Sequence, residues 1–176
     1  MTLAADIKPI PLSLVHTDLA AAAAGFGDAF ARTGFAVVSD HGIDQGLIDS
    51  ANAATKALFA LPEDVKRRYV VPGGGGQRGL TPFGVEAAKG HAKADLKEFW
   101  HVGRDLPAEH PLADSSMPPN IWPARPEAFR KTFETLYAEF DRVGATILSR
   151  IATYLRLDHQ WFDPAIADGN SVLRLL

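Results

Sequence analysis

The sequence predicts a mixed, α+β fold that is rich in helix, and three observations lead to this prediction. Apolar residues recur every three or four positions over long stretches, which is the period of an amphipathic helix. Shorter apolar runs with β-branched and aromatic residues lie between them and favour strands. The chain has 176 residues, 47% of them apolar, and is therefore long enough to bury a sizeable core.

The N-terminal part of the chain predicts a helix followed by a strand. Thr17 or Asp18 could cap a helix that runs to about Thr33, and its alanine run favours helical backbone. Gly34 ends this helix, because glycine readily adopts the left-handed backbone found after helix C-termini. Residues 35–38 (Phe-Ala-Val-Val) form a short apolar run, so we expect a buried strand there.

A second helix and a glycine-rich loop follow. Asp44 is suited to cap a helix that Pro62 closes, and Pro62 can itself open a short helix that ends at Tyr69. Residues 72–79 contain five glycines, which lose too much conformational freedom on ordering to favour a regular element. We therefore predict a loop in this segment.

The second half of the chain predicts two strands on either side of a long helix. Residues 95–102 favour a strand, and the proline-rich residues 106–126 favour an extended connection. A helix is expected over 126–155, about 45 Å long at 1.5 Å per residue. Its apolar stripe consists of Phe129, Phe133, Leu136, Phe140, Val143, Ile147, Ile151 and Tyr154. Residues 171–176 again favour a strand.

Composition excludes several classes of protein. The net charge of −3 and the lack of a basic cluster argue against nucleic acid or an anionic membrane as partner. The absence of cysteine excludes disulfides, zinc ribbons and thiol nucleophiles. No apolar stretch reaches the roughly 18 to 20 residues of a spanning helix. We therefore expect a soluble, cytoplasmic protein.

Five segments, in order, resemble one enzyme family. Residues 33–43 read TGFAVVSDHGI, residues 58–66 LFALPEDVK and residues 95–100 DLKEFW; residues 120–123 read NIWP and residues 173–176 LRLL. Each is short, but together they resemble the N-terminal signatures of the isopenicillin N synthase-like, non-haem Fe(II)/2-oxoglutarate-dependent dioxygenases.

The resemblance implies a fold, a domain division and a reaction. It implies that residues 1–170 form the N-terminal dioxygenase region and that residues 171–176 are the first strand of a double-stranded β-helix (jelly-roll) barrel that is otherwise absent. In such enzymes two histidines and one carboxylate hold Fe(II), and an arginine binds 2-oxoglutarate. In family order these ligands follow the Leu-Arg-Leu strand. The chain ends within this apolar strand, so we expect the barrel to be truncated. The parent protein is then expected to hold Fe(II) and 2-oxoglutarate. The chain alone is expected to hold neither and to be inactive.

Three residues are candidates for substrate binding, and none is a candidate catalytic residue or metal ligand. By resemblance, Arg78 and Phe83 match a stretch that reaches over the barrel mouth, and an arginine there could hold a substrate carboxylate. Arg174 alternates with apolar neighbours, so its side chain could face the barrel interior. The alternative for Arg78 is a solvated loop residue. Glu98 could line the pocket, but pairing with Lys97 or Arg104 is the favoured interpretation.

The histidines are interpreted mainly as structural. His16 and Asp18 form a His-x-Asp motif, but this motif lies at a helix cap. A capping residue and a solvated His16 are therefore the favoured interpretation. His41 is expected to form a ring hydrogen bond with backbone. A metal site formed by His91, His101 and His110 with nearby acids is an outside alternative.

Two other interpretations stay open. The chain could be a non-catalytic domain that binds a partner through an uncovered apolar face, or a truncated and inactive product. The expected partner of the parent is a small-molecule substrate, and the unfinished strand could let copies of the chain associate.

Overall fold

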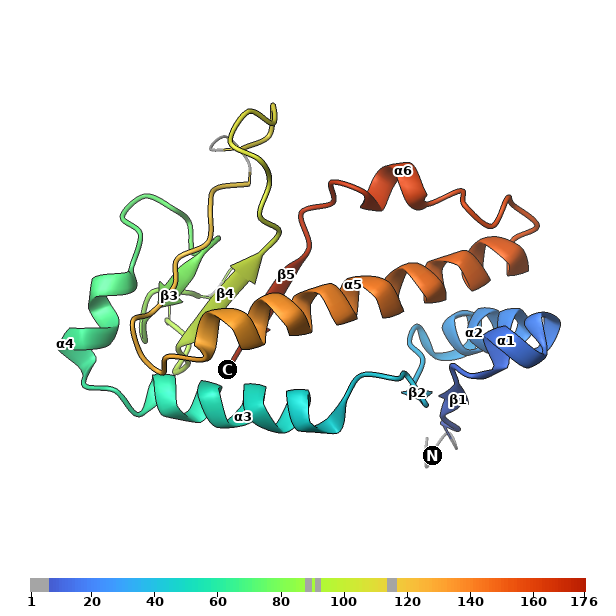
Figure 1. Cartoon of the computed structure of the whole chain (residues 1–176), viewed down its shortest axis with the longest axis horizontal. Coiled ribbons are helices and arrows are strands. Elements are labelled where there is room, and N and C mark those ends of the chain that lie inside the picture. Colours follow the sequence, from blue (N-terminus) through green and yellow to red (C-terminus); the bar gives the residue numbers. More distant parts are fainter. Residues whose placement is uncertain (1–6, 88–89, 91–92, 114–116) are drawn as a thin grey trace. The chain divides into compact units, whose positions relative to one another are not determined.

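A computed structural model describes residues 7–87, 90, 93–113 and 117–176. The chain divides into two compact units: one comprises the residues up to Ile43 with Glu139–Ala167, and the other comprises Asp44–Ala138 with Asp168–Leu176. The predicted α+β class is confirmed, because the structure combines small sheets with several helices, one of them long (Figure 1). Within the residues described, no helix is both long and apolar enough to cross a membrane.

The first unit contains a short parallel strand pair and several helices. Its elements are β1 (Ile10–Pro11), α1 (Leu14–Thr17), α2 (Leu19–Thr33), β2 (Val38–Ser39), the later part of α5 (Phe129–Tyr154) and α6 (Asp163–Ile166). The predicted first helix is confirmed. The Asp18 side chain accepts a hydrogen bond from the Ala21 amide at 2.9 Å, and Gly34 ends α2 with φ +80°.

The strand predicted over residues 35–38 is largely wrong. β2 begins only at Val38, and its sole partner in the sheet is the two-residue strand β1. Phe35 and Val37 are exposed. An apolar run forms a buried strand only where a sheet can cover it, and the two-residue pairing with β1 is too short to do so.

The second unit holds a three-stranded antiparallel sheet. Its elements are α3 (Gln45–Phe59), α4 (Glu63–Lys66), the 3-10 helix η1 (Arg67–Tyr69), β3 (Gly79–Thr81), β4 (Phe99–Gly103), the first turns of α5, and β5 (Val172–Leu175). The predicted helices after Asp44 and Pro62 are confirmed, and the Asp44 side chain accepts from the Leu47 amide at 2.9 Å. The strands lie in the order β3–β4–β5.

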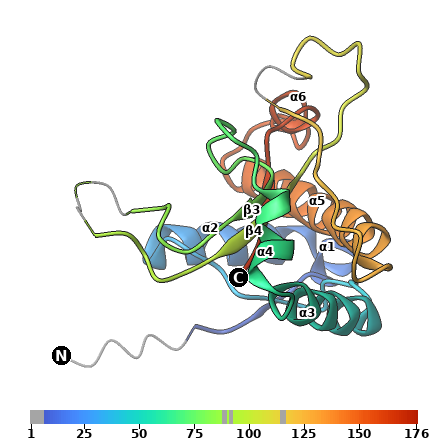
Figure 2. The same ribbon diagram turned by 90° about the vertical axis from the view of Figure 1, so that its left-hand side faces the viewer.

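One face of this sheet forms the core of the unit. Trp100 of β4 lies opposite Leu80 on β3 and Leu175 on β5, and all three are buried. The first turns of α5 cover this face, with the Phe129 ring 5.6 Å from that of Trp100 and 4.5 Å from that of Phe133. Figure 2 shows that the segment after β3 leaves the sheet on the side away from α5.

The long helix matches its prediction in extent but not in every apolar position. α5 begins three residues later than Pro126 and ends at Tyr154. Phe129 and Phe133 are buried, whereas Phe140, a member of the predicted apolar stripe, is exposed. From Glu139 onward the helix belongs to the first unit, so Phe140 lies outside the aromatic cluster that covers the sheet.

Candidate functional site

The sheet face opposite α5 carries the side chains of His101 and Arg174. Side chains alternate along a strand, so Phe99, His101 and Gly103 of β4 lie on the face opposite to Trp100. Arg174 on β5 is the register partner of His101. The alternation thus places Arg174 beside His101 on the face that α5 does not cover.

His101 connects a loop to Arg174. Its Nδ1 lies 2.6 Å from the Gly76 carbonyl oxygen, and its Nε2 accepts a hydrogen bond from Nε of Arg174 at 2.7 Å. A carbonyl can only accept, and the Arg174 Nε can only donate, so the ring is neutral with its proton on Nδ1. Burial is the main cause that lowers the pKa of His101, and the positive charges of Arg174 and Arg78 lower it further.

Arg174 lies across the aromatic ring of Phe99. The centre of its guanidinium is 4.3 Å from the ring centroid, a cation–π geometry. Nη2 of Arg174 is 3.8 Å from a Glu86 carboxylate oxygen. Glu86 also binds Lys97 at 2.8 Å, and this hydrogen bond is the main cause that lowers the pKa of Glu86. Three contacts thus hold an arginine that remains partly open to solvent.

Arg78 is buried, with only 2% of its surface exposed. Nη1 donates to the Gln77 carbonyl at 2.8 Å, whereas Nε and Nη2 have no hydrogen-bond partner in the part of the chain that the structure describes. Burial lowers its pKa, but a guanidinium stays protonated in proteins. The solvated-loop alternative for Arg78 is therefore wrong.

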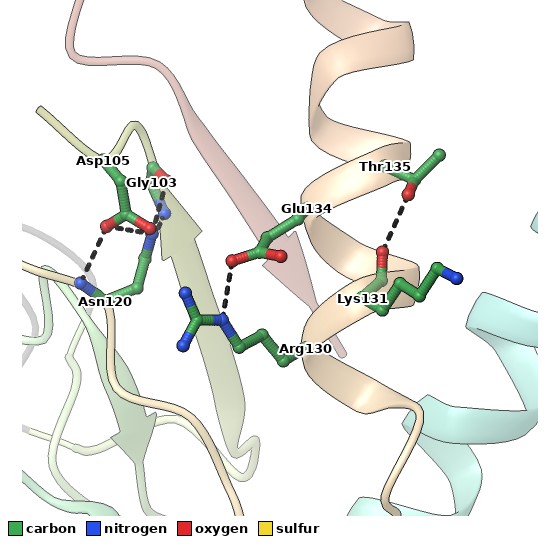
Figure 3. A network of polar contacts seen from close by, with 7 residues as sticks. All are labelled: Gly103, Asp105, Asn120, Arg130, Lys131, Glu134 and Thr135. Atoms are coloured by element: carbon green, nitrogen blue, oxygen red, sulfur yellow. Dashed lines mark hydrogen bonds and ion pairs between the residues drawn. The ribbon is translucent and has the colours of Figure 1, made fainter.

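The guanidinium of Arg78 packs against Gly103, where a Cβ atom would overlap it. Asn120 fixes this glycine on both sides: its Oδ1 accepts from the Gly103 amide at 2.8 Å, and its Nδ2 donates to the Gly103 carbonyl at 2.7 Å (Figure 3). Asn120 Nδ2 also donates to Asp105 at 2.9 Å. The end of β4 thus provides a rigid support for Arg78.

A pocket of about 520 Å³ opens beside this face. Arg78 and Glu86 contribute its charged side chains, and much of the remaining lining is apolar. The apolar lining includes Val70, Val71, Leu80, Pro82, Val85 and Phe99. Its volume is in the range of small-molecule sites, which combine apolar walls with a few placed polar groups.

The structure brings two of the three predicted substrate residues together. Arg78 and Arg174 both act electrostatically on His101, Arg78 lines the pocket, and Arg174 covers its Phe99 wall. Phe83 instead lines a separate pocket with Phe59 and Leu96. Substrate binding by all three remains a prediction.

Glu98 has a different partner from the two expected. Both of its carboxylate oxygens accept from Nζ of Lys66, at 2.6 and 2.9 Å. The structural role that was favoured for Glu98 is consistent with this pair. Lys66 was missed, because an ion pair between a helix and a residue next to a strand leaves no local pattern in sequence.

The described residues do not by themselves form an iron site, because no three histidine, aspartate or glutamate side chains among them lie close enough to hold a metal. The Nδ1 of His41 accepts from the Ile43 amide at 3.1 Å, which confirms its backbone bond. His91 lies outside the described residues. The sequence alone suggests only a metal-ligand role for His101, and the alternation of side chains along β4 is the signal that places it on the same face as Phe99.

Comparison with known proteins gives a consistent result. The family model described as non-haem dioxygenase in morphine synthesis N-terminal matches residues 6–125. Proline hydroxylase buaE of Petromyces alliaceus is 32% identical over 154 residues, which cover 84% of this chain and 46% of that protein. The 2-oxoglutarate-dependent dioxygenase citB of Monascus ruber is 34% identical over 142 residues, 77% of this chain and 42% of that protein.

Solved structures agree. A 2OG-Fe(II) oxygenase family protein from Caulobacter crescentus is 48% identical, with a TM-score of 0.86 over 96% of this chain and 54% of that chain. A full-length Neurospora crassa protein, solved in complex with alpha-KG, shares the fold at 22% identity, with a TM-score of 0.75 over 96% of this chain and 53% of its own. The chain thus spans about half the length of the proteins it matches.

Proposed function

Because the chain belongs to the non-haem dioxygenase N-terminal family, we propose that it forms the substrate-binding N-terminal part of a 2-oxoglutarate- and Fe(II)-dependent dioxygenase. The names of the relatives support this reaction class. In this proposal the iron and 2-oxoglutarate ligands come from residues outside these 176, and residues 171–176 contribute the first strand of a jelly-roll barrel. When bound, iron and 2-oxoglutarate supply the oxidising chemistry, and the residues of this chain bind and orient the substrate.

The observation that carries the substrate-binding role is the buried guanidinium of Arg78. Each buried donor without a partner is unfavourable by about 1–3 kcal/mol, and more when the group is charged. Arg78 lines the adjoining pocket, where its positive charge would favour a carboxylate. The apolar lining would hold the carbon skeleton of the same molecule. We infer a small, anionic substrate with an apolar part.

Arg174 and Phe83 have separate places in this proposal. Arg174 covers Phe99 at the edge of the pocket and adds positive charge to the face on which the anion binds. Phe83 lies in the neighbouring pocket with Phe59 and Leu96, where it would meet only a substrate large enough to extend there. Small substrates should therefore be insensitive to Phe83→Ala.

The test uses the protein from the complete reading frame that contains these residues. Arg78→Ala should raise KM for the primary substrate by about tenfold or more, since a charged hydrogen bond is worth roughly 1.5–3 kcal/mol. Uncoupled consumption of 2-oxoglutarate should change little. Arg130→Ala, at an exposed arginine of α5 (Figure 3), is the matched control.

Two results would overturn the proposal. An unchanged KM in Arg78→Ala would remove Arg78 from the substrate site. Succinate formation by the 176-residue chain alone, with Fe(II), 2-oxoglutarate and O₂, would show that the iron ligands are within it. If the complete protein also fails to form succinate, the non-catalytic, partner-binding alternative is favoured.

A further inference from the structure

His101 is the residue of this sheet face that links a loop to a charged side chain. The loop is the glycine-rich segment, residues 73–76, whose last carbonyl lies 2.6 Å from Nδ1 of His101. On the other side of the ring, Nε of Arg174 donates to Nε2 at 2.7 Å. The ring itself packs against Phe99, with centroids 4.6 Å apart. His101 therefore has almost no room to rotate.

Gly76 is shaped for this contact. Its φ of +71° is a backbone conformation that side chains rarely allow. A Cβ at this position would lie 2.7 Å from Oγ1 of Thr81, closer than such atoms approach. Glycine at residue 76 thus lets the loop present its carbonyl to His101 without strain.

The two hydrogen bonds of His101 require one protonation state. Protonation would place an N–H group on Nε2, directly opposite the donating Nε of Arg174, and this hydrogen bond would be replaced by repulsion. The charged groups around the ring are Arg174, Arg78 and Glu86. Glu86 is the only acid among them, and it is already bound to Lys97.

We propose that His101 is a positioning residue, which in its neutral form holds Arg174 over Phe99 and couples its guanidinium to the glycine-rich segment. It follows that an anion on this face binds less tightly in acid, although a more positive site would ordinarily bind it more tightly. This consequence for anion binding rests on the proposed function. The positioning of Arg174 does not, because it concerns groups of this chain alone.

The positioning claim is tested on the protein from the complete reading frame by ¹⁵N NMR of the histidine rings and of the arginine Nε–H groups. We expect a neutral Nδ1–H tautomer for His101 at about pH 7.5 and an Arg174 Nε–H that exchanges slowly with water. Both signals should change together as His101 titrates. A ring with its proton on Nε2, or an Arg174 signal that ignores this titration, would overturn the proposal.

Two isosteric variants separate the two hydrogen bonds. The amide of His101→Gln can accept from Arg174 in place of Nε2, whereas the amide of His101→Asn can donate to Gly76 in place of Nδ1. The probe is benzoate, whose carboxylate and apolar ring match the chemistry of the pocket. Its Kd is measured at about pH 7.5 and about pH 5.5, a range in which histidine titrates and carboxylates stay largely ionised.

We expect the wild-type protein to bind benzoate more weakly at the lower pH, by less than about tenfold, because an unshifted histidine would give at most about that factor and the pKa of His101 is lowered. His101→Gln should bind like the wild type at the higher pH and should lose the pH dependence. His101→Asn should bind about tenfold more weakly at both. Tighter binding by the wild type in acid, or equal loss in the two variants, would overturn the proposal. If the wild type does not bind benzoate at all, the anion site of the proposed function fails, and the NMR result still decides whether His101 positions Arg174.

Discussion

Removal of one partner of the buried ion pair between Lys66 and Glu98 should strongly destabilise the unit that holds the three-stranded sheet. The side chains are only 7% and 10% exposed, and Nζ lies 2.6 Å from one carboxylate oxygen. Lys66→Met keeps most of the side-chain volume but leaves the Glu98 carboxylate buried without its cation. Breaking a buried pair in this way destabilises a protein by about 3–5 kcal/mol.

Urea unfolding followed by tryptophan fluorescence measures this loss, because Trp100 and Trp122 lie in the same unit as the pair. With a slope of about 2 kcal/mol per molar urea, the midpoint should fall by about 1.5–2.5 M. The double variant Lys66→Met/Glu98→Leu should recover much of the loss, since an apolar pair of similar volume removes the unpaired charge.

The matched control is Arg130→Met, which breaks an exposed pair. Arg130 and Glu134 are one helical turn apart on α5, 2.7 Å apart and 62% and 42% exposed. Such pairs contribute about 0.3–0.5 kcal/mol. If Lys66→Met loses no more than Arg130→Met, the argument from burial is refuted.

Two other predictions concern a close contact and a titration. Gly27→Ala should destabilise the chain by about 2 kcal/mol or more, because the added methyl group would overlap the Tyr154 ring. Gly144→Ala, where no atom lies within 4 Å of the added methyl group, should instead stabilise its helix by up to about 1 kcal/mol. Thermal unfolding of both variants checks that the two changes in stability have opposite signs. His101 has a lowered pKa in the folded chain. Its contribution to stability is therefore fully present above about pH 6.5 and is lost as the pH falls through its folded pKa. The free energy of unfolding of His101→Gln should be less sensitive to pH in this range, and equal pH dependence in the variant and the wild type would contradict this prediction.

The helices could be predicted from sequence because their signals are local. Asp18 and Asp44 cap the helices that follow them, Gly34 ends one in a left-handed conformation, and the apolar spacing of α5 defines its length. Each signal lies within a few residues of the feature that it determines. The resemblance to the dioxygenase family rests on segments of the same kind, and the family match confirms it.

The site could be predicted only in part, because its contacts join residues that are distant in sequence. Arg78 was singled out, but its burial depends on the missing side chain of Gly103, which no local pattern reveals. The strand β3 was missed because it begins with glycine at the end of a glycine-rich loop, and only its pairing with β4 makes it a strand. The partner of Arg174 depends likewise on the register of β5 against β4.

The Arg78 guanidinium fills the space above the Gly103 Cα, and this has a consequence for attempts to vary either residue. A larger residue at 103 would displace the guanidinium of Arg78, and a smaller residue at 78 would leave a void at 103. Libraries that vary only residue 103 would retain this overlap, and those that vary only residue 78 would retain the void. A shorter, neutral residue at 78 combined with alanine at 103 is the exchange in which the lost and gained volumes compensate, and randomising the two codons together is the way to find it.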